Sequence, residues 1–83
     1  MKFWGKLRVG EKISADMTVE SADLKSAVFA ICQKFDLSKP VILDKHNNEM
    51  ALFNRTVFLP DDFIENVMFD MLEIEKIVNR KKT

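Results

Sequence analysis

The sequence predicts an α+β fold: a small antiparallel sheet of about three to five strands, opened by an N-terminal hairpin, with one amphipathic helix packed on one face. Apolar and polar residues alternate through residues 2–20, which is typical of half-buried strands. Through residues 22–36 the apolar residues recur every three or four positions, as on one face of a helix. A chain of 83 residues suffices for one core, so we expect a single domain over 1–79 and a frayed basic tail over 80–83.

Residues 2–20 are expected to form the hairpin, with Gly10–Glu11 as its turn. Gly5 interrupts the first arm, which predicts either a bulge or the close approach of another segment to the backbone. The apolar residues of the alternating pattern are Phe3, Leu7 and Val9 in the first arm and Ile13, Ala15, Met17 and Val19 in the second.

The helix over 22–36 is expected to begin near Ser21, because its hydroxyl group can accept a hydrogen bond from an amide of the first turn. Asp23 suits the positive end of the helix dipole, and Pro40 stops any continuation. The apolar stripe of this helix consists of Leu24, Ala27, Val28, Ile31 and Phe35.

In the middle of the chain, the short apolar run PVILD at residues 40–44 predicts the beginning of a strand. A turn is expected at Asn47–Asn48, because Asn tolerates left-handed backbone angles. A helical turn over 48–54 would follow, with Asn48 as its cap and with Met50 and Phe53 facing inward.

In the last third of the chain, residues 56–59 are predicted to form a strand. Residues 60–62 are predicted to form a turn or the first turn of a short helix, because Pro60 would stand where a backbone N–H donor is not needed. Residues 69–78, FDMLEIEKIV, are predicted to form a strand because β-branched residues alternate with charges. A helix is the alternative for this segment, since Phe69, Leu72 and Lys76 also fit a period of 3.6.

The stretch 44–49, DKHNNE, holds the only histidine, His46, close to Asp44 and Glu49. An extended backbone would put Asp44 and His46 on one face, where they could bind a metal or orient an imidazole. A protein metal site usually needs three or four ligands, and the chain has no second histidine. We therefore interpret DKHNNE as a polar connection.

No other motif carries chemistry. Cys32 lies at the edge of the helix's apolar face without a histidine partner, which is ordinary for a core cysteine. Gly5 and Gly10 are the only glycines, so a glycine-rich phosphate loop is excluded. The acidic residues after Pro60 lack the spacing and the glycine of a calcium loop. We predict no catalytic residue, no metal and no cofactor.

Thirteen basic residues balance thirteen acidic ones, so the long-range field that draws proteins to nucleic acids is missing. The N-terminus has no signal-like apolar region, and no stretch is apolar enough to span a bilayer. A lone cysteine, which cannot form an intramolecular disulfide, fits a reducing compartment. We expect a cytoplasmic protein that binds neither membrane nor nucleic acid.

The charges are segregated along the chain. Residues 1–12 carry four basic groups and one acid, whereas 61–75 carry six acids and no base. We predict that the first strand lies beside the 69–78 segment, with Lys6 or Arg8 facing Glu73 or Glu75 across adjacent strands. The alternative is that the same segments pair between molecules.

Two aromatic residues do not fit the core pattern and are our candidate interface. Trp4 alternates with Phe3 and shares a face with Lys6 and Arg8, and Phe29 lies off the apolar stripe of the helix. Either ring could be covered by the C-terminal half of the chain, in which case it is an ordinary packed residue. Otherwise both are exposed anchors of the kind enriched at protein interfaces.

The stretches KFWGK, FDLSKPVIL, FLPDDFIE and FDMLEIE resemble those of a group of small bacterial proteins of uncharacterised function, over most of the chain. The resemblance implies a bacterial cytoplasmic protein and assigns no activity or site residue.

We therefore expect a non-catalytic accessory or protein-interaction module, which binds itself as a homodimer or binds another protein. The alternative is a small enzyme or ligand-binding domain whose pocket, between helix and sheet, contains Asp44, His46 or Cys32. Nucleic-acid binding through Lys2, Lys6, Arg8 and the tail Arg80–Lys82 is a third and weaker hypothesis.

Overall fold

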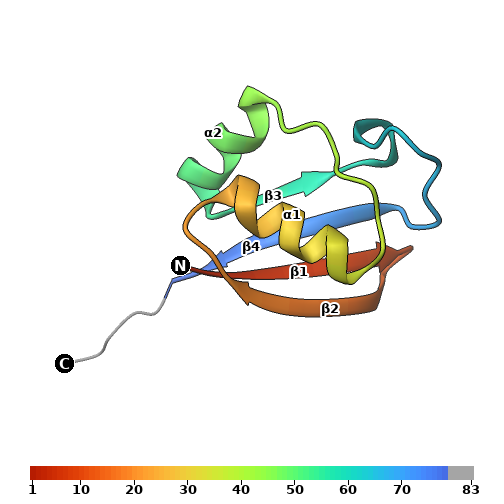
Figure 1. Cartoon of the computed structure of the whole chain (residues 1–83), viewed down its shortest axis with the longest axis horizontal. Helices are drawn as coiled ribbons and strands as arrows, with labels where there is room; N and C mark the ends of the chain where they lie inside the picture. The colour runs from red at the N-terminus through yellow and green to blue at the C-terminus, as the bar shows by residue number, and fades with distance from the viewer. Residues whose placement is uncertain (79–83) are drawn as a thin grey trace.

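The computed structural model describes residues 1–78 and confirms the α+β fold (Figure 1). The tail 80–83, for which fraying was predicted, lies outside the described residues. In chain order the elements are β1 (Lys2–Val9), β2 (Lys12–Glu20), α1 (Leu24–Lys34), α2 (Asp44–Phe53), β3 (Arg55–Phe58), the 3-10 turn η1 (Pro60–Asp62) and β4 (Met71–Ile77).

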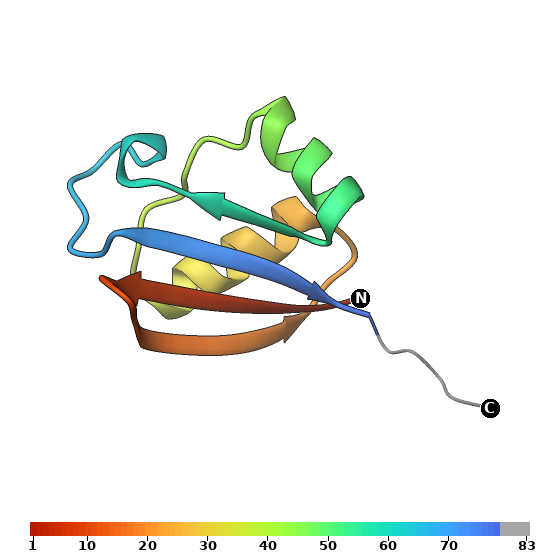
Figure 2. The ribbon, with the colours of Figure 1, turned by 180° about the vertical axis from the view of Figure 1, so that it is seen from behind.

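The four strands form one antiparallel sheet in the order β2-β1-β4-β3. Helix α1 lies across one face of the sheet, and α2 packs beside β3 on the same side (Figure 1). Within residues 1–78 no helix crosses the other face, which we call the open face (Figure 2). The fold therefore has two layers, with the apolar core between the sheet and α1.

The N-terminal hairpin forms as predicted, and Gly10 adopts the left-handed angle that the turn requires (φ 63°). The pairing shifts between Leu7 and Arg8: Leu7 pairs with Ala15, but Arg8 pairs with Ile13. Ser14 is therefore the extra residue of a β-bulge. The bulge moves Ile13 out of the alternation with Ala15, Met17 and Val19 and onto the face of Arg8, where it is exposed.

Gly5 marks a close approach rather than a bulge. It lies in the centre of the sheet, between Met17 of β2 and Ile74 of β4. A Cβ atom added there would lie 2.8 Å from Ile31 Cδ1 and 2.9 Å from Ile31 Cγ2, closer than carbon atoms can pack. The missing side chain thus lets α1 settle on β1, with Ile31 fully buried.

Helix α1 buries the predicted stripe, but its cap is Asp23 and not Ser21. The Asp23 carboxylate accepts a hydrogen bond from the Ser26 amide at 2.9 Å, and this bond lowers the pKa of Asp23. The Ser21 amide instead donates to the Met1 carbonyl at 2.8 Å. Asp23 is the N-cap because its backbone is extended immediately before the first helical residue.

The structure corrects the prediction for residues 40–54. PVILD forms no strand, Asn47–Asn48 is not a turn, and DKHNNE is not a polar connection but the first half of α2. The helix begins at Asp44 because His46 Nδ1 accepts the Leu43 amide at 2.9 Å, which caps the first turn from inside the helix. Asn48 is therefore an interior helical residue and no cap.

The inward face of α2 also differs from expectation. Met50 is buried as predicted, and His46, one turn earlier, is buried with it. Phe53 was expected to face inward, but it is the last helical residue and is 69% exposed. Asn54 then adopts left-handed angles (φ 57°) and turns the chain directly into β3.

The C-terminal segment forms a strand, which settles the alternative in favour of β4, and Pro60 opens η1. β4 lies between β1 and β3, so the predicted neighbourhood of the first strand and the 69–78 segment is confirmed. In this register Lys6 pairs with Glu73 and Leu7 with Leu72. Leu72 and Ile74 are fully buried on the core face.

We expect Gly5→Ala to lower the free energy of unfolding by about 1–3 kcal/mol, because α1 must shift away from the sheet to admit the methyl group. Urea unfolding measures the loss. In Gly5→Ala combined with Ile31→Val, which removes the Cδ1 atom, the total loss should be smaller than the sum of the two single losses. Additive losses would contradict the proposed contact.

Candidate functional site

Charged side chains cover the centre of the open face. Lys6 Nζ lies 3.0 Å from Glu75 Oε1 and 3.5 Å from Glu73 Oε2, and Arg8 Nε donates to Glu73 Oε1 at 2.7 Å. Arg55 Nη1 lies 3.6 Å from Glu73 Oε2. The predicted pairing of Lys6 and Arg8 with Glu73 and Glu75 is therefore confirmed.

Lys6 and Glu73 are only 4% and 5% exposed, although no helix within residues 1–78 covers this face. Burial alone would raise the pKa of Glu73, but the hydrogen bond from Arg8 and the charges of Lys6, Arg8 and Arg55 outweigh it, and the pKa is lowered. Glu73 thus stays ionised at the centre of three basic groups.

Trp4 belongs to the same network. Its indole Nε1 donates to Asp16 Oδ2 at 2.7 Å, and the Lys6 ammonium group lies 3.9 Å from the centre of its ring. The ring is half-buried, with Asp16 at its edge and Lys6 over one face. Its polar group and one ring face thus have partners within the chain.

His46 lies in the core and not at a surface. Its ring stacks on Phe58 with centroids 4.2 Å apart. Nε2 lies 3.6 Å from Asp62 Oδ2 and has no hydrogen-bond partner among residues 1–78. Burial lowers the pKa of His46, and the negative charge of Asp62 opposes this only in part. Because Nδ1 accepts the Leu43 amide, the neutral ring carries its proton on Nε2.

Cys32 is fully buried in α1, and burial raises the pKa of its thiol to about 11. A thiol in this state is a poor nucleophile at neutral pH. Asp44 is exposed at the start of α2, whereas Cys32 and His46 lie beneath the surface. The structure therefore does not bring Asp44, His46 and Cys32 together in an open pocket.

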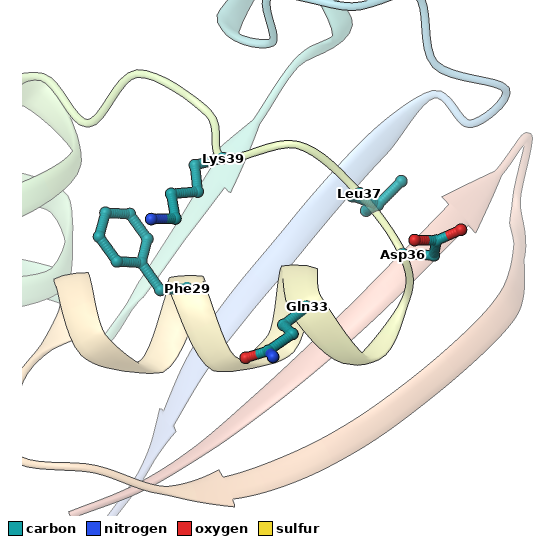
Figure 3. Close-up of a pocket in the computed structure, with 5 residues that line it drawn as sticks. All are labelled: Phe29, Gln33, Asp36, Leu37 and Lys39. Atoms are coloured by element: carbon teal, nitrogen blue, oxygen red, sulfur yellow. The ribbon is translucent and has the colours of Figure 1, made fainter.

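Phe29 lies on the outer side of α1 between two surface hollows. The first, of about 440 Å³, is lined by α1 and the segment that follows it, with Phe29, Gln33, Asp36, Leu37 and Lys39 (Figure 3). The second, of about 330 Å³, is lined by Lys25, Phe29, Pro40, Ile42 and Asn47. Phe29 lines both, so we treat them as one groove, the Phe29 groove.

Two ammonium groups contact the ring of Phe29. Lys39 Nζ lies 4.5 Å from the ring centre and Lys25 Nζ lies 5.8 Å from it. Figure 3 shows Lys39 reaching toward the ring, whereas Asp36 lies at the far end of the groove. Among residues 1–78, no carboxylate lies within 4 Å of either ammonium group. The centre of the groove is thus an aromatic surface flanked by positive charge.

The two candidate interface residues lie on opposite sides of the sheet. Trp4 is on the open face, and Phe29 is on the helix that covers the other face. The position of Phe29 off the apolar stripe was visible in the sequence. The hollows beside it were not, because the segment 36–42 that lines them has no periodic pattern.

Comparison with protein-family models, with curated proteins and with solved structures finds no match to this chain. Over residues 1–78, no group of three or more His, Cys, Asp or Glu side chains is placed to hold a metal ion. In the same part of the chain, neither helix is long and apolar enough to cross a membrane.

Glu73→Lys is expected to lower the free energy of unfolding by up to about 3 kcal/mol, because it leaves buried Lys6 beside another positive charge. Glu75→Lys should cost only about 1 kcal/mol or less, because that side chain is 41% exposed. Leu72→Ala, on the core face, should cost about 2–5 kcal/mol. Chemical denaturation compares the three variants, and equal losses for Glu73 and Glu75 would contradict the role given to burial.

Stability is expected to fall on acidification below about pH 6.5 because of His46. In the unfolded chain His46 binds a proton near that pH. In the folded chain its pKa is lowered, so it binds the proton only at a lower pH. The free energy of unfolding should therefore be constant from about pH 8 to 7 and decrease as the pH falls below about 6.5, by at most about 1.4 kcal/mol per unit.

His46→Gln is the matched control, because the amide oxygen can still accept the Leu43 amide but does not titrate. Its stability should change little over this range. If wild type and His46→Gln lose stability in parallel, other groups cause the pH dependence.

Proposed function

We propose that this protein is a non-catalytic interaction module that binds a segment of another protein chain in the Phe29 groove. The observation that carries the proposal is an aromatic ring, half-buried on the outer side of α1, with a hollow on each side of it. Aromatic residues in this setting are enriched among the anchors that dominate protein interfaces.

The shape of the groove supports an extended chain segment as ligand. One wall is the α1 stripe Lys25, Phe29 and Gln33, whose spacing of four residues keeps them on one side of the helix. The other wall is the irregular segment 36–42. A segment laid between these walls would place one side chain on the ring of Phe29 and its neighbours in the two hollows.

The burial of the reactive side chains supports a non-catalytic role. Cys32 and His46 are fully buried, and neither lines the Phe29 groove. Trp4 is a weaker anchor than Phe29, because its N–H group already donates to Asp16 and its ring lines neither hollow of the groove. A reducing cytoplasm suits the chain, since its one thiol is buried and has no second cysteine to pair with.

Photo-crosslinking in the cells that express the protein tests the proposal. A benzophenone amino acid at Gln33, inside the groove, should give a protein adduct of defined mass. The same amino acid at Ala30, exposed on α1 outside the lining of the groove, and at Thr18, on the open face, should not. Phe29→Ala should abolish the Gln33 adduct, whereas Trp4→Phe should leave it unchanged.

Circular dichroism and thermal unfolding would establish that Phe29→Ala is folded. If Gln33 crosslinks no more than Ala30, or if the adduct survives in folded Phe29→Ala, the groove is not the binding site.

A further inference from the structure

The segment that runs from η1 toward β4 has side chains that complement the Phe29 groove. Residues 61–68, which we call the acidic loop, contain Asp61, Asp62 and Glu65 together with Ile64 and Met68. Ile64 is 84% and Met68 96% exposed, the largest exposed fractions among the large apolar side chains of residues 1–78. Both side chains are therefore available for burial against a partner.

The acidic loop is held at both ends. Phe63 and Phe69 are 6% and 7% exposed and pack edge to face with centroids 5.3 Å apart. The loop is thus fixed to the core on either side of Ile64 and Met68, which are presented outward. A segment held in this way loses little conformational entropy when it binds.

The loop and the groove are complementary in charge and polarity. The groove presents a ring flanked by Lys25 and Lys39, and the loop presents Ile64 with Asp61 and Glu65 close to it in sequence. Asp61 and Glu65 are exposed, and no basic group of residues 1–78 lies within 4 Å of their carboxylates. Both sets of charges are therefore free to pair between molecules.

Within one molecule the two surfaces adjoin and do not overlap. A third hollow, of about 270 Å³, is lined by Leu37 and Ser38 on one side and by Glu65 and Val67 of the acidic loop on the other. Leu37 also lines the Phe29 groove. A twofold axis near Leu37 would place the loop of each copy on the groove of the other, which is the arrangement that a symmetric dimer requires.

On these grounds we infer that the segment bound in the Phe29 groove is the acidic loop of a second copy of this chain, so that the protein forms a reciprocal homodimer. The inference rests on the proposed function and names its partner. The zero net charge of the chain removes the overall repulsion that would oppose association of two copies.

Sedimentation equilibrium with charge-reversed variants tests the inference. Wild type should dimerise, and Lys39→Glu and Glu65→Lys should each raise the dissociation constant about tenfold or more, because each places like charges together at two symmetric contacts. Lys12→Glu, on the exposed start of β2, should not change it.

An equimolar mixture of Lys39→Glu and Glu65→Lys chains should form a mixed dimer more tightly than either variant dimerises alone. One contact of the mixed dimer joins the reversed pair and the other joins the original pair, so both are attractive. A structural defect in either variant would not be repaired by mixing.

A wild-type chain that stays monomeric up to about 1 mM, or a mixture no tighter than its components, overturns the inference. If Gln33 crosslinks to a different protein, the second-copy inference falls and the proposed function stands. If Gln33 gives no adduct, the proposed function falls as well.

Discussion

The pairing of β1 with β4 is the interaction on which the rest of this structure depends. It joins the two ends of the described chain at the centre of the sheet, with a local strand on each outer side, β2 beside β1 and β3 beside β4. The two faces define its register together. Leu7 and Leu72 are paired on the core face, and Lys6 and Glu73 are paired on the open face. A slip by one residue would turn charged side chains toward α1 and apolar side chains toward the open face, so the register is strongly specified.

The position of α1 follows from this central pair. Gly5 is the only core-facing position of β1 without a side chain, and Ile31 fills the space above it. Because α1 is seated there by Ile31, its opposite side faces outward, and Phe29 comes to lie between α1 and the segment 36–42. The contact of Ile31 with Gly5 therefore also sets the orientation of the Phe29 groove.

Some charged side chains pair within the molecule, and this pairing determines which charges stay unpaired at the surface. The basic residues of β1 and the acids of β4 neutralise one another on the open face. The lysines beside Phe29 and the carboxylates of Asp61 and Glu65 have no such partner among residues 1–78. A chain without net charge thus still has a basic and an acidic surface side by side, which favours a partner of matching pattern.

The sequence by itself determined the elements whose periodicity is local: the hairpin, the buried stripe of α1 and the alternation of β4. It also predicted that β1 and β4 are neighbours, because opposite charges segregate between the two segments, and the structure excluded the alternative that they pair only between molecules. Only the tertiary structure decided the start of α2. His46 is a polar residue in a polar stretch, so the sequence indicates a surface turn, but in the fold it accepts the Leu43 amide and stacks on Phe58 in the core. The groove at Phe29 was decided in the same way, because it lies between a helix and an irregular segment whose path is set by long-range packing.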